Sequence, residues 1–197
     1  MEKWLNHYPK GNWIIATSIY KITHNIESGK VLSMLSGIIA YIFVLFGIYK
    51  TKLNLASKTV TSALLSFNPV FIYQSLSYYM DGILVSIFLS LAFISFRFIN
   101  QREKFLFWPF LFLSVIFINL KLTSIVFWIA LVLCVFLYVW FSDKMRFALW
   151  FAKASSLTLV VSALFIGFNP FVTNFVGYGN PLYPAIGKGA YDYVSTN

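Results

Sequence analysis

Six long apolar stretches, separated by short polar segments, run through most of this chain and constrain its fold. A helix that crosses a bilayer needs roughly 20 mostly apolar residues. Hydrophobic residues make up 59% of the sequence and charged residues only 11%, more apolar surface than a soluble domain of 197 residues can bury. The sequence therefore predicts an all-α polytopic transmembrane helix bundle with about six spans. The expected spans are Val31–Tyr49, Val60–Tyr78, Gly82–Asn100, Phe105–Asn119, Leu122–Phe141 and Ala148–Phe168.

The second expected span contains Asn68 and Pro69 near its middle. A proline inside a helix removes a backbone donor and clashes with the preceding turn, so it kinks or breaks the helix. Such a break is tolerated in a membrane only where neighbouring groups or water satisfy the backbone. We therefore expect an irregular second span.

Basic residues alternate between the loops and predict the orientation of the bundle. The loops after the first, third and fifth spans are rich in lysine and arginine, whereas the other loops carry only Lys121. The positive-inside rule places the base-rich loops in the cytoplasm, and both ends of this chain on the outer side. This asymmetry accounts for most of the net charge of +9, so we expect no nucleic-acid partner. The cytoplasmic bases are Lys50, Lys52, Lys58, Arg97, Arg102, Lys104, Lys144, Arg146 and Lys153.

The segments outside the spans divide the chain into three regions. Residues 1–30 are expected to form an outer loop with an N-terminal interfacial amphipathic helix over residues 12–24, for which Asn12 is a plausible cap. Trp13, Ile15, Ile19 and Ile22 are expected on its apolar face. The transmembrane bundle covers residues 31–168, and residues 169–197 form an outer loop or tail, rich in glycine, proline and tyrosine, with room for one short helix.

Asp81 lies in a short polar break between the second and third spans. An ionisable group so close to a span is costly and therefore marks a functional site by default. The alternative is structural, since an anion at the start of a helix is stabilised by the helix dipole.

Four polar groups gather on the predicted outer side, around His7–Lys10, Asp81, Lys121 and Tyr178–Pro184. Two lysines and an aspartate at one membrane face can form a water-filled pocket for an anionic lipid headgroup, because lysine binds phosphate as a point charge. The alternatives are that Lys10 is a lysine whose ammonium group reaches up to the membrane surface and that Lys121 is an ordinary loop lysine. Neither His7 nor His24 has a partner at metal-ligand spacing, so no metal site is expected.

These segments resemble the GT-C glycosyltransferases, polytopic enzymes related to protein O-mannosyltransferases and to bacterial aminoarabinose transferases. The resemblance covers nearly the whole chain and depends on the order of four short segments: Tyr8–Trp13 at the start of an interfacial helix, Asp81 after the Asn-Pro break, Lys121–Thr123 at the start of a later span, and Gly179–Pro184.

The resemblance implies an integral membrane glycosyltransferase of the cell envelope that takes sugar from a polyprenyl-phosphate donor to an outer-face acceptor, in the bacterial plasma membrane. It implies that Lys10 contacts the lipid phosphate, that Asp81 shapes the donor or acceptor pocket, and that Lys121 is a second residue on the phosphate side. Tyr8 and Tyr79, in the same segments, complete the candidate substrate-binding residues. The expected partners are the lipid-linked sugar and membrane lipid, with no further cofactor.

One part of the family pattern is missing from the sequence. The family's catalytic aspartate lies upstream of the lysine that Lys10 resembles, where this chain has only Met1–Pro9, with Glu2 as the sole acid. We therefore expect a fragment without its catalytic aspartate, and the catalytic residues are unassigned. The alternatives are a transporter or flippase for a lipid-linked sugar, which predicts paired helix breaks, and a non-catalytic membrane subunit.

Overall fold

The structure, a computed structural model, describes residue 7 and residues 9–101, 104–142 and 145–183, and none of these lies in a β-strand. The described chain is all-helical, as predicted. The longer helices are α2 (Gly11–Thr23), α3 (Val31–Ile48), α4 (Leu55–Ser66), α6 (Asp81–Gln101), α7 (Phe107–Ile118), α8 (Leu122–Phe141) and α9 (Met145–Val161). Shorter helical segments are η1 (Ile26–Lys30), α5 (Pro69–Gln74), η2 (Lys104–Leu106), η3 (Ser162–Ile166), η4 (Phe168–Val172) and α10 (Thr173–Tyr178).

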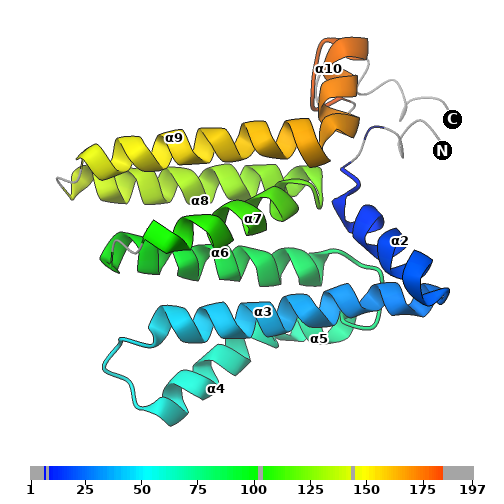
Figure 1. The fold of residues 1–197 in the computed structure, drawn as a ribbon. Helices are drawn as coiled ribbons and strands as arrows, with labels where there is room; N and C mark the ends of the chain where they lie inside the picture. Colours follow the sequence, from blue (N-terminus) through cyan, green and yellow to red (C-terminus); the bar gives the residue numbers. More distant parts are fainter. Residues whose placement is uncertain (1–6, 8, 102–103, 143–144, 184–197) are drawn as a thin grey trace, which may run out of the picture.

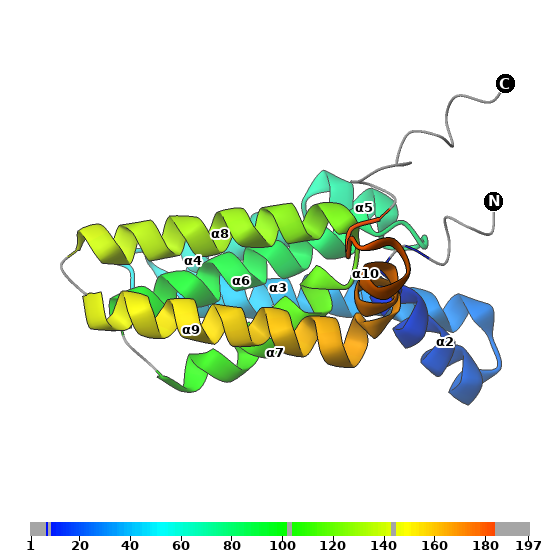
Figure 2. The same ribbon diagram turned by 90° about the horizontal axis from the view of Figure 1, so that it is seen from above.

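Helices α3, α6, α7, α8 and α9 run back and forth along a common direction, so that the bundle has two distinct ends (Figure 1). One end, called here the α2 end, carries α2, α10 and the first residues of α6 and α8. The opposite end carries the connection between α3 and α4. Seen from above, α2 and α10 again lie together at one end of the bundle (Figure 2). The described first and last residues therefore lie at the same end.

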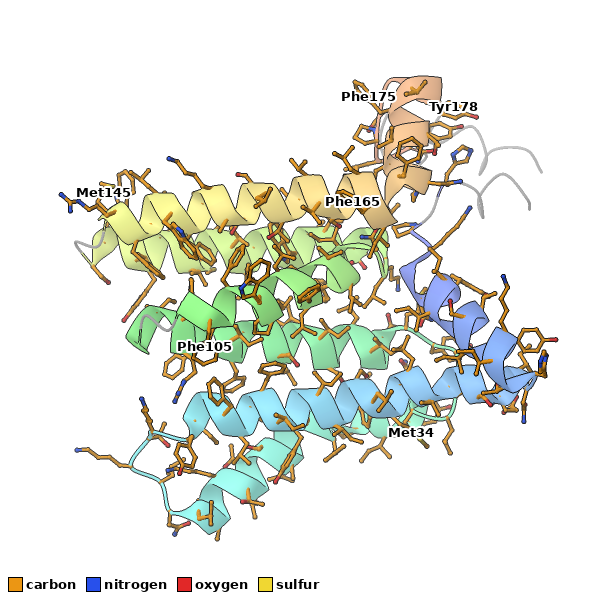
Figure 3. All side chains as sticks on the ribbon, in the orientation of Figure 1. Met34, Phe105, Met145, Phe165, Phe175 and Tyr178 are labelled. Carbon is orange, nitrogen blue, oxygen red and sulfur yellow. The ribbon has the colours of Figure 1, made fainter. Side chains whose placement is uncertain are left out.

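Four helical segments are long and apolar enough to cross a membrane: Ile26–Ile48, Asp81–Ile99, Leu122–Phe141 and Met145–Ile166. Helix α7 is apolar but shorter. Large apolar side chains are exposed along these segments, including Met34, which is 44% exposed, and Phe165, which is 79% exposed (Figure 3). An apolar surface of this extent identifies the chain as a membrane protein.

The second predicted span, Val60–Tyr78, is not one helix. Helix α4 ends at Ser66, and Phe67 has φ −100° and ψ 47°, outside the helical region. The side chain of Asn68 then accepts the backbone N–H of Phe71, with Pro69 in the first turn of α5. Both residues favour the start of a helix over its interior, so the local sequence ends one helix and begins another.

Helix α6 lies at the centre of the packing. In its most apolar stretch 67% of the residues are buried, against 33% for the span ending at Ile48 and 22% for each of the last two spans. Its Leu91 and Ile94 are fully buried and belong to one core cluster with Phe117 of α7, Trp128 of α8 and Phe151 of α9. Helices α3, α5, α7 and α8 pack directly against α6, and the other three spans turn more of their surface outward.

An interfacial amphipathic helix over residues 12–24 was predicted. Helix α2 covers nearly the same residues, its position at the membrane interface stays a prediction, and two details differ. Asn12 does not cap it, because Lys10 occupies the cap position and Asn12 is a buried residue of the first turn. The predicted apolar face is also divided, since Trp13 and Ile22 are exposed while Ile15 and Ile19 are half-buried. The short helix expected after residue 169 is α10.

Candidate functional site

Asp81 and Lys121 form an ion pair at the α2 end. The Lys121 Nζ lies 3.1 Å from the Asp81 Oδ1, and the two side chains are 40% and 50% exposed. Asp81 is the first residue of α6, and Lys121 directly precedes α8. Two residues distant in sequence that were predicted on one face of the membrane are therefore in direct contact. Because both are half-exposed, either partner remains accessible to another charged group.

Three contacts position the start of α6. The side-chain oxygen of Gln74, at the end of α5, accepts the backbone N–H of Gly82 at 2.8 Å. The Tyr78 hydroxyl donates to the carbonyl of Ile26, and Lys30 lies over the Tyr78 ring at 5.9 Å from its centroid. The connection between α5 and α6 is thereby held against the segment that leads into α3.

Asn119 joins α2 to the turn that carries Lys121. Its buried side-chain amide donates to the carbonyl of Val115 and to the hydroxyl of Ser162, both at 2.8 Å. The backbone carbonyl of Asn119 accepts the backbone N–H of Gly11 at 2.9 Å. These bonds place Lys10, the neighbour of Gly11, in the same region as Lys121, two residues beyond Asn119.

Gly11 is required for this contact. A Cβ built on Gly11 would lie 2.7 Å from the carbonyl oxygen of Asn119. That distance is shorter than any real contact of a Cβ atom, so a side chain would push α2 away from the turn. No pattern in the sequence indicates this role, because it depends on an approach between segments far apart in the chain.

Lys10 lines a shallow groove of about 300 Å³ on α2. The groove is lined by Lys10, Trp13, Ile14, Thr17, Ser18 and Lys21 and does not include Asp81. Thus Asp81 contacts Lys121, whereas a cavity shared by Lys10 and Asp81 stays a prediction. Tyr79 is 68% exposed in the connection just before Asp81, and Tyr8 lies outside the described residues.

A second cluster at the α2 end joins two of the polar segments that were predicted on one side of the membrane, although none of its residues was assigned a binding role. The ring of His7 packs edge-on against Tyr178 and Tyr183, whose rings stack with centroids 4.0 Å apart. His7 Nδ1 lies 2.5 Å from Asn174 Oδ1. The sequence placed the segments of His7 and of the two tyrosines on one side of the membrane, but their contact depends on α10.

The proton on His7 can be assigned from its partner. The amide nitrogen of buried Asn174 donates to the carbonyls of Tyr183 and His7, at 2.8 and 3.3 Å. The remaining Oδ1 can only accept, so His7 Nδ1 must carry the hydrogen. Among the described residues there is no group of three or more metal-ligating side chains.

Comparisons with protein-family models, with curated proteins and with solved structures found no match to this chain.

Proposed function

We propose that the chain crosses the membrane six times, with the α2 end on the outer side. The alternating helix directions support six passes, with α7 as a short one and α4 plus α5 as a broken one (Figure 1). Lys50, Lys52 and Lys58 lie at or near the connection between α3 and α4, at the opposite end, which supports a cytoplasmic position for that end. Helix α2 then lies at the outer membrane interface.

We further propose an integral membrane glycosyltransferase, or part of one, that uses a polyprenyl-phosphate-linked sugar. The observation that carries this proposal is the half-exposed Asp81–Lys121 pair, with Lys10 close by in the same region. A cation and a carboxylate at the level of the lipid headgroups match the two parts of such a donor. Lysine attracts the phosphate, and aspartate accepts hydrogen bonds from sugar hydroxyls. The family resemblance assigns the same residues.

The proposed reaction is direct displacement at the anomeric carbon. A hydroxyl or phosphate oxygen of the acceptor forms the new bond to that carbon, and the bond to the donor phosphate breaks, releasing polyprenyl phosphate. Lys121 and Lys10 stabilise the charge that develops on the leaving phosphate. A carboxylate accepts the acceptor's proton where the nucleophile is a hydroxyl, and the resemblance places that carboxylate upstream of Lys10.

The test uses the whole chain in detergent with a polyprenyl-phosphate hexose, polyprenyl phosphate and polyprenol as ligands. We expect the two phosphate-containing lipids to bind and polyprenol to bind far more weakly. Replacing Lys121 by Gln should weaken phosphate-dependent binding about tenfold, the size of one charge-assisted hydrogen bond. Lys52→Gln, at the opposite end, is the matched control. Equal binding of polyprenol and polyprenyl phosphate would overturn the proposal.

A transporter for the same lipid is the second candidate. The observation in its favour is a repeated Phe-Asn-Pro sequence at two irregular positions, Phe67–Pro69 between α4 and α5 and Phe168–Pro170 beyond α9. Paired breaks are typical of transporters. In proteoliposomes, movement of a fluorescent lipid-linked sugar between leaflets would favour transport. Release of polyprenyl phosphate from the donor would favour transfer, and binding with neither result would favour a non-catalytic subunit.

A further inference from the structure

Helix α2 has two faces with different surroundings. At 100° per residue, Gly11, Asn12, Ile15, Ala16 and Ile19 fall on one side of the helix, and all of them are buried or half-buried. Gly11 contacts Asn119 in the turn before α8, and the Ala16 side chain lies close to Gly29 of η1. This side is the contact of α2 with the rest of the protein.

The groove occupies the other side. Its lining residues Lys10, Trp13, Ile14, Thr17, Ser18 and Lys21 follow one another at the spacing of a single helix face, directed away from the bundle. Trp13 is 58% exposed and Ile14 50% exposed. A face that combines lysine, hydroxyl and aromatic groups in this way is unlike the surface of α8, which has no charged residue and suits hydrocarbon.

The groove is cationic. Two of its six lining residues are lysines and none is acidic. The nearest acid in the following segment, Glu27, is paired with Lys30 in η1. The charge of the groove is therefore not balanced by η1, and an anion is the complementary ligand.

We propose that this groove binds the phosphate of an anionic bilayer phospholipid at Lys21, with Trp13 and Ile14 beside the glycerol and upper acyl carbons. Lys10 and Lys21 are eleven positions apart in the sequence, about 16 Å along a helix at 1.5 Å per residue. We place the phosphate of this phospholipid at the Lys21 end of the groove and the donor phosphate at the Lys10 end. The proposal rests on α2 lying at the membrane interface and does not depend on sugar transfer.

The ligand would hold the outward face of α2. On the inward face, α2 is held by the Gly11–Asn119 bond and packs against η1, whereas Ile22, near the end of α2, is 82% exposed. A phospholipid at Lys21 holds the distal end at the depth of the headgroups. Tryptophan at that depth is the residue type that membrane interfaces favour.

Tryptophan quenching in nanodiscs tests the proposal. The full chain is reconstituted with either brominated phosphatidylglycerol or brominated phosphatidylcholine at equal mole fraction. The Trp13 signal is taken as the difference between the parent protein and Trp13→Phe. We expect stronger quenching of Trp13 by phosphatidylglycerol, with an apparent preference of about fivefold, the effect of one lysine near an anionic surface. Lys21→Gln should remove this preference, and Lys52→Gln should leave it intact.

Three results would overturn the proposal. Equal quenching by the two lipids would show contact with hydrocarbon but no headgroup site. An absence of Trp13 quenching by either lipid would mean that the face is covered by protein or water. Polyprenyl phosphate is then added at roughly a few mole per cent of the lipid, so that it displaces the phospholipid only where it binds more tightly. Recovery of Trp13 fluorescence on this addition would identify the groove as the donor site instead. None of these readouts requires transfer activity, so the two proposals can fail separately.

Discussion

The backbone N–H of Gly11 donates to the carbonyl of Asn119 at 2.9 Å, and there is no room between the two residues for a side chain. Asn119 also holds Ser162 through its side chain. One buried asparagine therefore joins the first turn of α2, the turn before α8 and the segment that follows α9.

Replacing Gly11 by Ala should destabilise the protein although alanine favours helices. The new Cβ would meet the Asn119 carbonyl oxygen at 2.7 Å. Overpacking of this kind costs about 1–3 kcal/mol. Thermal unfolding in detergent would measure it. Gly177→Ala is the matched control, because a methyl group at that position would meet nothing within 4 Å and α10 should gain from the higher helix propensity of alanine. Equal shifts for the two variants would refute the close contact.

The Asp81–Lys121 pair should show coupling in a double-mutant cycle. Stability is measured for Asp81→Asn, Lys121→Gln and the double variant. We expect a coupling free energy of about 0.2–1 kcal/mol, because both side chains are half-exposed, and a smaller value at high salt. Additive single effects at low salt would show that the pair makes no contribution in solution.

His7 should stabilise the junction between the start of the described chain and α10. His7→Phe keeps a ring against Tyr178 and Tyr183 but removes the donor to Asn174 Oδ1. An unpaired buried acceptor costs about 1–3 kcal/mol. His24→Asn replaces an exposed histidine in the left-handed conformation, which asparagine tolerates, and should change the melting temperature little. A loss of stability with His24→Asn as large as with His7→Phe would contradict the assigned bond.

Cysteine labelling tests the orientation of the bundle. The single cysteine, Cys134, is replaced by serine, and cysteine is then placed at Tyr79 or at Leu55. Both positions are exposed, at opposite ends of the bundle. A membrane-impermeant maleimide should label position 79 in intact cells and position 55 only after permeabilisation. Labelling of position 55 from outside would reverse the proposed topology.

The sequence predicted the helical class and four of the long helices, because apolar stretches of spanning length have few alternatives. It also indicated the irregularity at Asn68 and Pro69, since both residues act locally. It could not show that α4 begins as early as Leu55, where Asn54 caps the helix through the N–H of Ser57. Helix ends depend on such single contacts, which hydropathy does not detect.

The candidate site was predicted less completely. The basic loops and the polar breaks placed Asp81, Lys121 and Lys10 at one end, but sequence alone could not show which of them pair. The ion pair requires α6 and α8 to start side by side, and the groove requires Lys10 and Lys21 to face away from the bundle. The role of Asn119 was missed because a lone asparagine in a turn has no distinctive pattern.

The central position of α6 has a consequence for sequence variation. Helices that face lipid accept many apolar residues, because a fluid solvent adapts to their shape. Helix α6 instead meets fixed neighbours along most of its length, with Leu91 and Ile94 fully enclosed. In a saturation scan, substitutions between similar apolar residues should be tolerated on α8 and rejected on α6. The tolerance of each position should therefore depend on how completely its side chain is buried, and not on how apolar the helix is.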